Sequence, residues 1–291
     1  MRFKRRLVVI FATSVTVATM AVAVPGTALA DNSAVTANEV AAALDNVDAR
    51  SGLVLDAASS SAVSLLDDPK LGVQVTLPNG QKMSIGLPSA KQGGKGIATR
   101  KGAIAYAGSS GSANAAVPAA DSVQLLTVIE SHKATTTYAY PITLPQGVKV
   151  EVTQRNGGGA LVYDAAGKLM AIAPPPWARD ANDQDVPTWF TTDGKTLTQH
   201  IAHKARGVQY PVVADPRFGW NWGPTVWFSR GETQFVITAA GTVWLSAIAG
   251  ALTGGWVGPA IVATLVEAAK SALRNNQCLA ITWVVPWFYQ C

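Results

Sequence analysis

The chain has 291 residues, of which 48% are hydrophobic and only 14% are charged, so it is long enough to bury a sizeable core. Its formal net charge is +5, with 23 basic and 18 acidic residues. Four of the basic residues lie in the first six positions, and without them the balance is 19 to 18, or +1. Such a balance gives no electrostatic case for nucleic-acid binding and disfavours a cationic membrane-lytic peptide.

The first thirty residues have the pattern of a secretory signal peptide. A basic start is followed by a mostly apolar, uncharged stretch over residues 7–24, which Pro25-Gly26 would end. Ala28-Leu29-Ala30 fits the small-residue cleavage rule, so the mature chain is expected to begin at Asp31. The break and the small residues favour cleavage over an uncleaved anchor. The prediction is an exported protein, secreted or associated with the cell surface.

Residues 31–69 are rich in Ala and Ser, and one short helix is expected there, capped by Asn38 and ending near Val47. A β-rich module is expected over residues 70–216. Its clearest signal is a hairpin around Pro78-Asn79-Gly80, because Asn-Gly supplies the positive φ angles of a tight turn. The segments 89–96 and 107–120, rich in Gly, Ser and Ala, are expected to be loops.

Short alternating segments separated by turn signals continue to residue 214. Their spacing of roughly ten residues predicts a sandwich or a partly rolled meander. Pro174–Pro176 cannot lie in a central strand and marks a crossing or an edge. The expected strands are 123–130, 135–144, 148–154, 160–163, 169–173, 188–192, 197–202 and 208–213.

The stretch 233–266 carries no charged side chain and dominates the last quarter of the sequence. One straight helix of this length would exceed the thickness of a bilayer core. Residues 254–259 hold three glycines and a proline, which predict a break. Two helices, about 233–252 and 259–273, are therefore expected to form a hairpin.

Small residues recur every four positions on both expected helices. Rows at this spacing lie on one face, so the helices are expected to press together along them, and Gly250→Leu is expected to disrupt their packing. Insertion into a membrane is an alternative, and strands also stay open because Val, Ile and Thr form them readily. The row consists of Ser246, Gly250, Gly254, Gly258, Ala260, Thr264 and Ala268.

Seven of the nine tryptophans lie after Arg217. An indole ring is amphipathic, so aromatics that flank an apolar helical pair are candidate anchors at a bilayer interface. The alternative is that they are large pieces of a small core. The candidate anchors are Trp220, Trp222, Trp227, Trp283 and Trp287.

Cys278 and Cys291 are the only cysteines, and in an exported chain they are expected to pair. Intermolecular disulfides are the alternative. The pair would close an apolar tail, expected as a small hairpin that turns near Pro286. This tail would complete a Trp-rich helical hairpin domain over residues 217–291.

The run Tyr210-Pro211-Val212-Val213-Ala214-Asp215-Pro216, after the turn Asp193-Gly194-Lys195, resembles a segment of exported actinobacterial proteins of uncharacterised function. It is also similar to the YPV-x-x-DP strand of β-rich secreted proteins of the Rhs type. The region after it resembles Gly/Ala-rich hairpins with a Cys-bearing tail in small secreted actinobacterial proteins. These resemblances imply a boundary near Pro216 and a surface-exposed role, and they carry no catalytic residues across.

Signatures of catalysis and metal binding are absent from the sequence. It lacks G-x-S-x-G, S-x-x-K, H-E-x-x-H and Walker A motifs. His200 and His203 are three apart, so on a strand they would point to opposite faces. The acidic run 180–185 lacks the order of a calcium loop and is expected to be solvated. No metal or cofactor is expected, although a hydrolase triad assembled only in space stays open.

The sequence therefore predicts an α+β protein with a sandwich-like or meander β-module, followed by a small helical hairpin domain with a disulfide-closed tail. The expected function is that of a secreted, non-catalytic binding or interaction protein. Its partner would be a protein or a membrane surface, engaged through the apolar hairpin. The alternative is a membrane-active, bacteriocin-like toxin or effector carried by the β-module.

Overall fold

The computed structural model describes residues 35–51, 62–66, 72–77, 79–88, 95–99, 102–119, 121–153, 158–220, 225–228, 230–253 and 257–290. Contacts between Cα atoms divide the chain into a unit Met1–Asp31 and a compact unit Asn32–Cys291. The predicted signal peptide lies outside the described residues. The second unit is β-rich: its described residues form three antiparallel sheets and four helices, and its fold class is α+β.

The first sheet has six antiparallel strands in the order β1-β2-β3-β8-β14-β13. Its side chains alternate, so that one face is buried and the other meets solvent, most clearly along β8. The predicted Asn79-Gly80 turn is confirmed between β2 and β3, where Gly80 has a φ of 81°. The strands are β1 (Val63–Leu65), β2 (Val73–Thr76), β3 (Lys82–Ile85), β8 (Thr137–Thr143), β13 (Thr188–Thr192) and β14 (Thr196–Ile201).

The second sheet has ten strands, eight of them in the order β4-β5-β6-β7-β16-β11-β10-β9. Two further strands join it, since β15 pairs with β7 and with β12. The strands β15 and β16 follow one register along β7, interrupted only at Asp215-Pro216. The members are β4 (Ile97–Ala98), β5 (Ile104–Tyr106), β6 (Ser112–Pro118), β7 (Ser122–Ile129), β9 (Val148–Val152), β10 (Ala160–Asp164), β11 (Leu169–Ala173), β12 (Ala178–Arg179), β15 (Val212–Ala214) and β16 (Arg217–Gly219).

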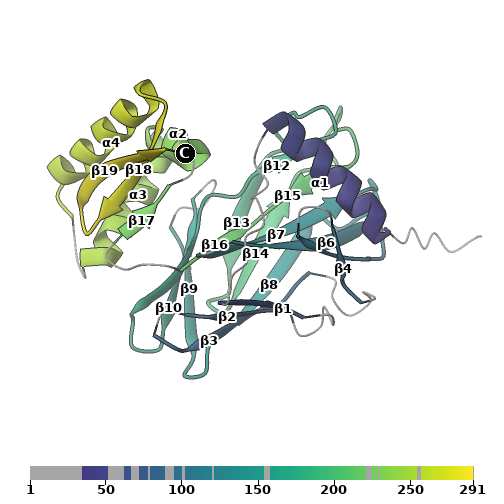
Figure 1. Cartoon of the computed structure of the whole chain (residues 1–291). Coiled ribbons are helices and arrows are strands. Elements are labelled where there is room, and N and C mark those ends of the chain that lie inside the picture. Colours follow the sequence, from purple (N-terminus) through teal and green to yellow (C-terminus); the bar gives the residue numbers. More distant parts are fainter. Residues whose placement is uncertain are drawn as a thin grey trace, which may run out of the picture. The chain divides into compact units, whose positions relative to one another are not determined.

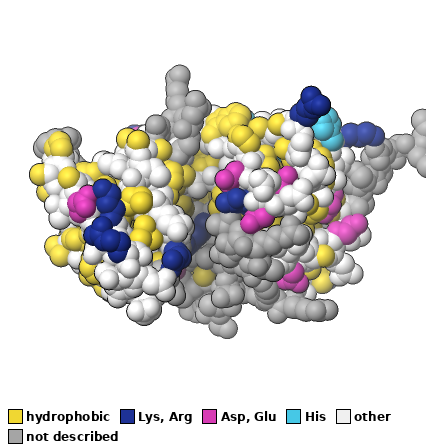
Figure 2. Space-filling view, turned by 90° about the horizontal axis from the view of Figure 1, so that it is seen from above, with side chains coloured by type: hydrophobic (Ala, Val, Ile, Leu, Met, Phe, Trp, Pro, Cys, Tyr) yellow, Lys and Arg dark blue, Asp and Glu magenta, His cyan; other side chains and the backbone are white. Residues whose placement is uncertain are grey.

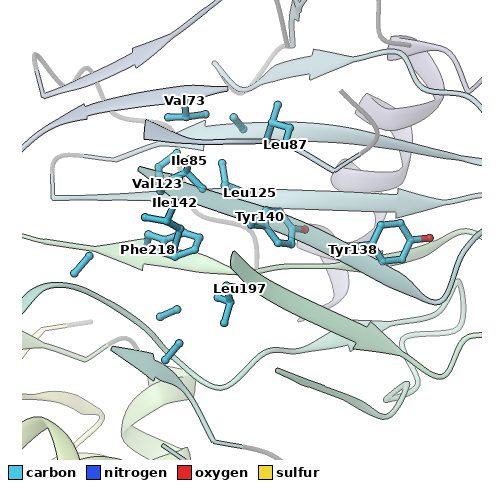
Figure 3. Close-up of a cluster of buried hydrophobic side chains, with 14 of the residues drawn as sticks. Val73, Ile85, Leu87, Val123, Leu125, Tyr138, Tyr140, Ile142, Leu197 and Phe218 are labelled. Atoms are coloured by element: carbon cyan, nitrogen blue, oxygen red, sulfur yellow. The ribbon is translucent and has the colours of Figure 1, made fainter. Parts of the chain in front are cut away.

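The main core lies between these two sheets. Ile85 of the first sheet is close to Val123 and Leu125 of the second (Figure 3). The hydroxyl groups of Thr127 and Tyr140 lie 2.9 Å apart across the same interior. The opposite face of the ten-stranded sheet is covered twice, by α1 (Ala37–Ser51) over β5, β6 and β15, and by C-terminal elements over β10 and β11. All eight residues of β7 are buried, because both faces of this strand are covered.

Helix α1 (Figure 1) begins with a capping box that the sequence analysis missed. The Thr36 hydroxyl accepts a hydrogen bond from the Glu39 backbone N–H at 3.3 Å, and the Glu39 carboxylate accepts one from the Thr36 N–H at 2.7 Å. These hydrogen bonds lower the pKa of Glu39. The predicted cap, Asn38, lies inside the helix, which runs past the expected end at Val47.

The prediction of a loop over residues 107–120 is wrong. Most of this segment is β6, which pairs with β7 along its whole length. Ala113 and Ala115 face α1, whereas Ala116 faces the main core. The small side chains of β6 pack closely between α1 and the main core, so its composition reflects close packing and not a loop.

The C-terminal region contains more elements than the expected hairpin. Its strands β17-β18-β19 form a three-stranded antiparallel sheet, and three helices pack against it. Leu279 and Ile281 of β18 contribute to the apolar core that these helices share. The elements are β17 (Thr225–Trp227), α2 (Arg230–Val236), α3 (Ala239–Thr253), α4 (Pro259–Arg274), β18 (Gln277–Thr282) and β19 (Val285–Gln290). We call the segment from β17 to β19 the helical unit.

The expected helix 233–252 is two helices, α2 and α3, which are bent by 101°. Thr238 produces the break because its hydroxyl accepts a hydrogen bond from the Gly241 N–H at 3.0 Å and so caps α3. A Cβ at Gly241 would lie 1.9 Å from the Phe235 carbonyl oxygen, so only glycine fits at this corner. None of the described helices is by itself long and apolar enough to span a membrane. Only the bent pair α2 and α3, taken together, has the length and apolar composition of a membrane span.

The tail turns two residues earlier than expected. Thr282 pairs with Val285, so the β18–β19 turn consists of Trp283 and Val284, and Pro286 lies inside β19. Upstream, β16 carries the ten-stranded sheet three residues beyond the expected boundary at Pro216.

Candidate functional site: an apolar groove on the helical unit

A groove of about 740 Å³ lies between α3 and α4. Small-molecule sites in proteins commonly have volumes of about 300–1,000 Å³ and mostly apolar walls. Among the described residues that line the groove, only Glu267 is charged. The lining consists of Thr242, Ser246, Ala247, Gly250, Val257, Pro259, Val262, Ala263, Val266 and Glu267.

The hydroxyl groups of the groove are already hydrogen-bonded within their own helix. Thr242 donates to the Thr238 carbonyl oxygen at 2.8 Å, and Ser246 donates to the Thr242 carbonyl oxygen at 2.8 Å. Thr253 and Thr264 make the same bond four residues back. Because each hydroxyl hydrogen is used in this way, the groove offers mainly C–H surface to a ligand.

The single carboxylate of the groove is paired. Lys270 Nζ lies 2.7 Å from Glu267 Oε1, one turn along α4. The hydrogen bond from Lys270 and then its charge lower the pKa of Glu267, and Arg274 adds to this effect. Glu267 is therefore ionised at neutral pH, and its charge is balanced at the rim.

The predicted small-residue row does not form the contact between the helices. Ser246 and Gly250 line the groove, while Ala260 and Thr264 are exposed. Gly258 and Ala268 are partly buried, and Gly254 lies outside the described residues. The expectation that Gly250→Leu would wedge the helices apart therefore loses its basis.

The helical unit is instead held by larger side chains. Burial of large apolar side chains gains more free energy than burial of glycine or alanine. The helices therefore turn these side chains inward, and the small residues are left beside the groove. The large inward side chains include Trp244, Leu245, Ile248 and Leu265.

The five candidate aromatic anchors are not gathered in one place. Trp220 is buried in the main core, whereas Trp283 at the β18–β19 turn is 57% exposed. Trp287 is partly buried and donates from Nε1 to the Thr282 hydroxyl at 2.8 Å. Trp222 and the side chain of Trp227 lie outside what the structure describes. The anchor hypothesis is therefore carried only by Trp283 among the described residues.

Trp244 is a buried packing residue of α3 that the sequence analysis did not single out. It is buried at 1% exposure and meets Phe228 and Phe235 edge-on, with ring centroids 5.7 and 6.0 Å away. Its indole also lies against Gly159 at the start of β10, where a Cβ would come within 2.5 Å of Nε1. Trp244 thus joins the floor of α3 to the ten-stranded sheet.

The residues considered for metal binding have other roles. His203 Nε2 donates to the Thr135 carbonyl oxygen at 2.9 Å, and its Nδ1 lies 2.9 Å from the Tyr210 hydroxyl. His200 stacks on Trp189, with ring centroids 5.2 Å apart. Asp180 is buried, and its carboxylate accepts backbone N–H groups of its own and a neighbouring loop. Within the described ranges, no group of three His, Cys, Asp or Glu side chains is placed to hold a metal ion.

Asp215, in the Tyr-Pro-Val run, is buried away from the groove. Its carboxylate accepts hydrogen bonds from Gln124 Nε2 at 3.1 Å and from the Trp177 N–H at 3.2 Å. Burial raises the pKa of Asp215 to about 7. These contacts tie the proline-rich crossing after β11 to the central strand β7, which is a structural role.

No protein family matches this chain, and no curated protein or solved structure is significantly similar to it. The resemblance to secreted proteins of the Rhs type stays a prediction.

Proposed function

We propose that this protein is exported and that it binds an apolar, chain-like ligand in the groove between α3 and α4, without catalysing a reaction. The groove carries this proposal because it combines a sizeable volume with mostly small or apolar walls, internally bonded hydroxyls and a carboxylate that is paired with Lys270. The β-module serves as the scaffold on which the helical unit is presented.

A lipid surface is the proposed source of this ligand. Large apolar side chains also remain exposed at several places on the helical unit outside the groove. A bilayer offers both an apolar chain for the groove and an apolar medium for these side chains. They are Ile237, Val243, Ile261, Trp283, Val285 and Phe288.

Export is compatible with the described contacts nearest to the predicted cleavage site. The backbone of Val35 pairs with Gly108 through N–H···O bonds of 3.1 and 3.0 Å, and Val35 is buried. Val35 lies four residues after Asp31, the predicted start of the mature chain. A leader removed before Asp31 would leave these contacts intact.

A disulfide between Cys278 and Cys291 is part of the proposal. Cys278 is buried in β18 opposite Tyr289, and Cys291 follows Tyr289 by two residues. Residues two apart on a strand share a face, so extension of β19 would bring Cys291 to the side of Cys278. Cys291 itself lies outside the described residues.

The disulfide is tested with the variant Cys291→Ser, using protein that a producing strain has secreted into the culture medium. Closing this loop is expected to stabilise the fold by about 3 kcal/mol, so the variant should unfold at lower urea concentration. Thiol titration of the unreduced, denatured wild type should find no free thiol. Two titratable thiols per chain, or a disulfide-linked dimer on a non-reducing gel, would contradict the proposed pairing.

The proposed function is tested by sedimentation of the mature protein with vesicles of neutral phosphatidylcholine. Ala263→Glu places a carboxylate in the groove, and its burial against an acyl chain should weaken binding by roughly tenfold or more. Ala260→Glu is the matched control, because Ala260 is also exposed on α4 but does not line the groove. Failure of the wild type to sediment with vesicles, or equal weakening by both variants, would refute the groove as the site.

A membrane-active effector is the second candidate. The bent pair α2 and α3, which is apolar enough only as a pair, favours it. Release of a trapped dye in the same vesicle experiment would support this candidate over passive binding.

A further inference from the structure

The stripe of α4 that lines the groove continues into positive charge. Val266 lies in the groove wall, and Lys270 and Arg274 follow it at intervals of four residues, which is the spacing of one helix face. Eight residues of helix cover about 12 Å. One face of α4 therefore passes from an apolar wall to cationic side chains within the reach of a single amphiphile.

A third cation reaches the same end of α4 from elsewhere in the chain. Arg230, the first residue of α2, donates from its guanidinium to the side-chain oxygen of Asn276, just beyond α4. Glu267 is the carboxylate paired within this group, while the nearby Glu232 pairs with Arg217 at 3.3 Å. Figure 2 shows Lys and Arg side chains gathered beside an acidic side chain at the left of the view, with apolar and uncharged surface around them.

These cations are not needed to cap the helix. The Asn275 N–H donates to the Ala272 carbonyl oxygen at 3.0 Å, and the Asn276 N–H donates to that of Leu273 at 3.2 Å. The Asn275 side-chain amide also donates to the Ser271 carbonyl oxygen at 3.0 Å. Because the last carbonyl groups of α4 have these donors, the guanidinium groups can bind an anion beside the helix end.

We propose that the groove binds an anionic phospholipid from a bilayer, with an acyl chain between α3 and α4 and the phosphate at Arg230, Lys270 and Arg274. This assignment rests on the proposed function and adds the chemistry of the head group. The choice follows from charge complementarity at one end of an apolar groove. The whole mature chain is almost neutral, so a preference for anionic lipid arises from this local group and not from net charge.

The experiment compares sedimentation with vesicles of phosphatidylcholine alone and of phosphatidylcholine containing phosphatidylglycerol, at low salt. The wild type should bind the anionic vesicles more tightly. The double variant Arg230→Gln/Arg274→Gln should lose roughly 10- to 25-fold in affinity for them, at about fivefold for each cation, and should keep its affinity for neutral vesicles. Lys270 is left in place because it balances Glu267.

A second double variant, Lys204→Gln/Arg206→Gln, removes the same charge from the exposed loop before β15 and should leave both affinities unchanged. Equal loss in both double variants would show that total charge decides, and would overturn the proposal. Equal binding of the wild type to the two kinds of vesicle would also overturn it, while the proposed function would stand. Absence of binding to either kind would refute both.

Discussion

Trp244→Ala is expected to lower the free energy of unfolding by about 3–5 kcal/mol, because it removes the largest buried side chain among the described residues of the helical unit. Phe228 and Phe235 would lose their edge-on partner, and the floor of α3 would lose its contact with Gly159. Chemical denaturation followed by far-UV circular dichroism measures the change. For a chain of this size such a loss exceeds the effect of most single substitutions.

Trp283→Ala is the matched control, because it removes the same side chain from a position that is 57% exposed. Its unfolding free energy should stay within about 0.5 kcal/mol of the wild type. Similar losses in the two variants would show that Trp244 is not the packing centre of the helical unit. A separate early transition in Trp244→Ala would show that the helical unit unfolds independently of the sheets.

The stability of the protein is expected to fall as pH rises from about 4 to about 7. Burial raises the pKa of Asp215 in the folded state to about 7 from the ordinary value of 3.8. Across this window the unfolded chain loses the Asp215 proton while the folded chain retains it, so deprotonation favours unfolding. A difference of three pKa units corresponds to a loss of up to about 4 kcal/mol, complete above pH 7.

Asp215→Asn should remove this pH dependence and make the protein more stable than the wild type at pH 8. An amide stays neutral, its oxygen can accept the Trp177 N–H, and the Gln124 amide can turn to pair with it. Urea midpoints at pH 5, 6, 7 and 8 measure the effect. Asp193→Asn is the control: backbone hydrogen bonds lower the pKa of Asp193, so its contribution is lost only at lower pH. A wild-type midpoint that is flat across this range would contradict the assignment.

The strands were the part of the fold most readily predicted from sequence. Each of the eight strands expected between residues 122 and 214 overlaps an observed one, because their alternation and turn residues are local signals. The strand β6 was missed because its Ser- and Ala-rich composition is also typical of loops. The α2–α3 break was missed because Thr238 and Gly241 act as a cap and a corner only through contacts with the preceding turn.

Only the small residues that line the groove could be singled out from the sequence, and the groove itself was not predicted. Ser246 and Gly250 were expected to lie against the partner helix, whereas they line the groove, where α3 leaves space. Whether the other helix fills that space depends on which way the large side chains of α3 and α4 point. They point toward an apolar core to which β17 and β18 contribute, and β17 was not expected from the sequence. The cationic end was also hidden, because Arg230 and Arg274 are brought together only by the fold.

The central position of β7 has a consequence for how the chain acquires its structure. Its partners β15 and β16 come late, and Gln124 is separated by 91 residues from Asp215, which it contacts. Such high contact order slows folding, because the entropic cost of closing a long loop comes before the free energy gained from strand pairing. If the protein is exported as proposed, a chain threading outward could pair β7 with β6 early, but it would leave the other edge of β7 unpaired until some two hundred residues had crossed. Late pairing of β15 and β16 with β7 would keep the chain unfolded enough for translocation and would delay its folding until it has crossed the membrane.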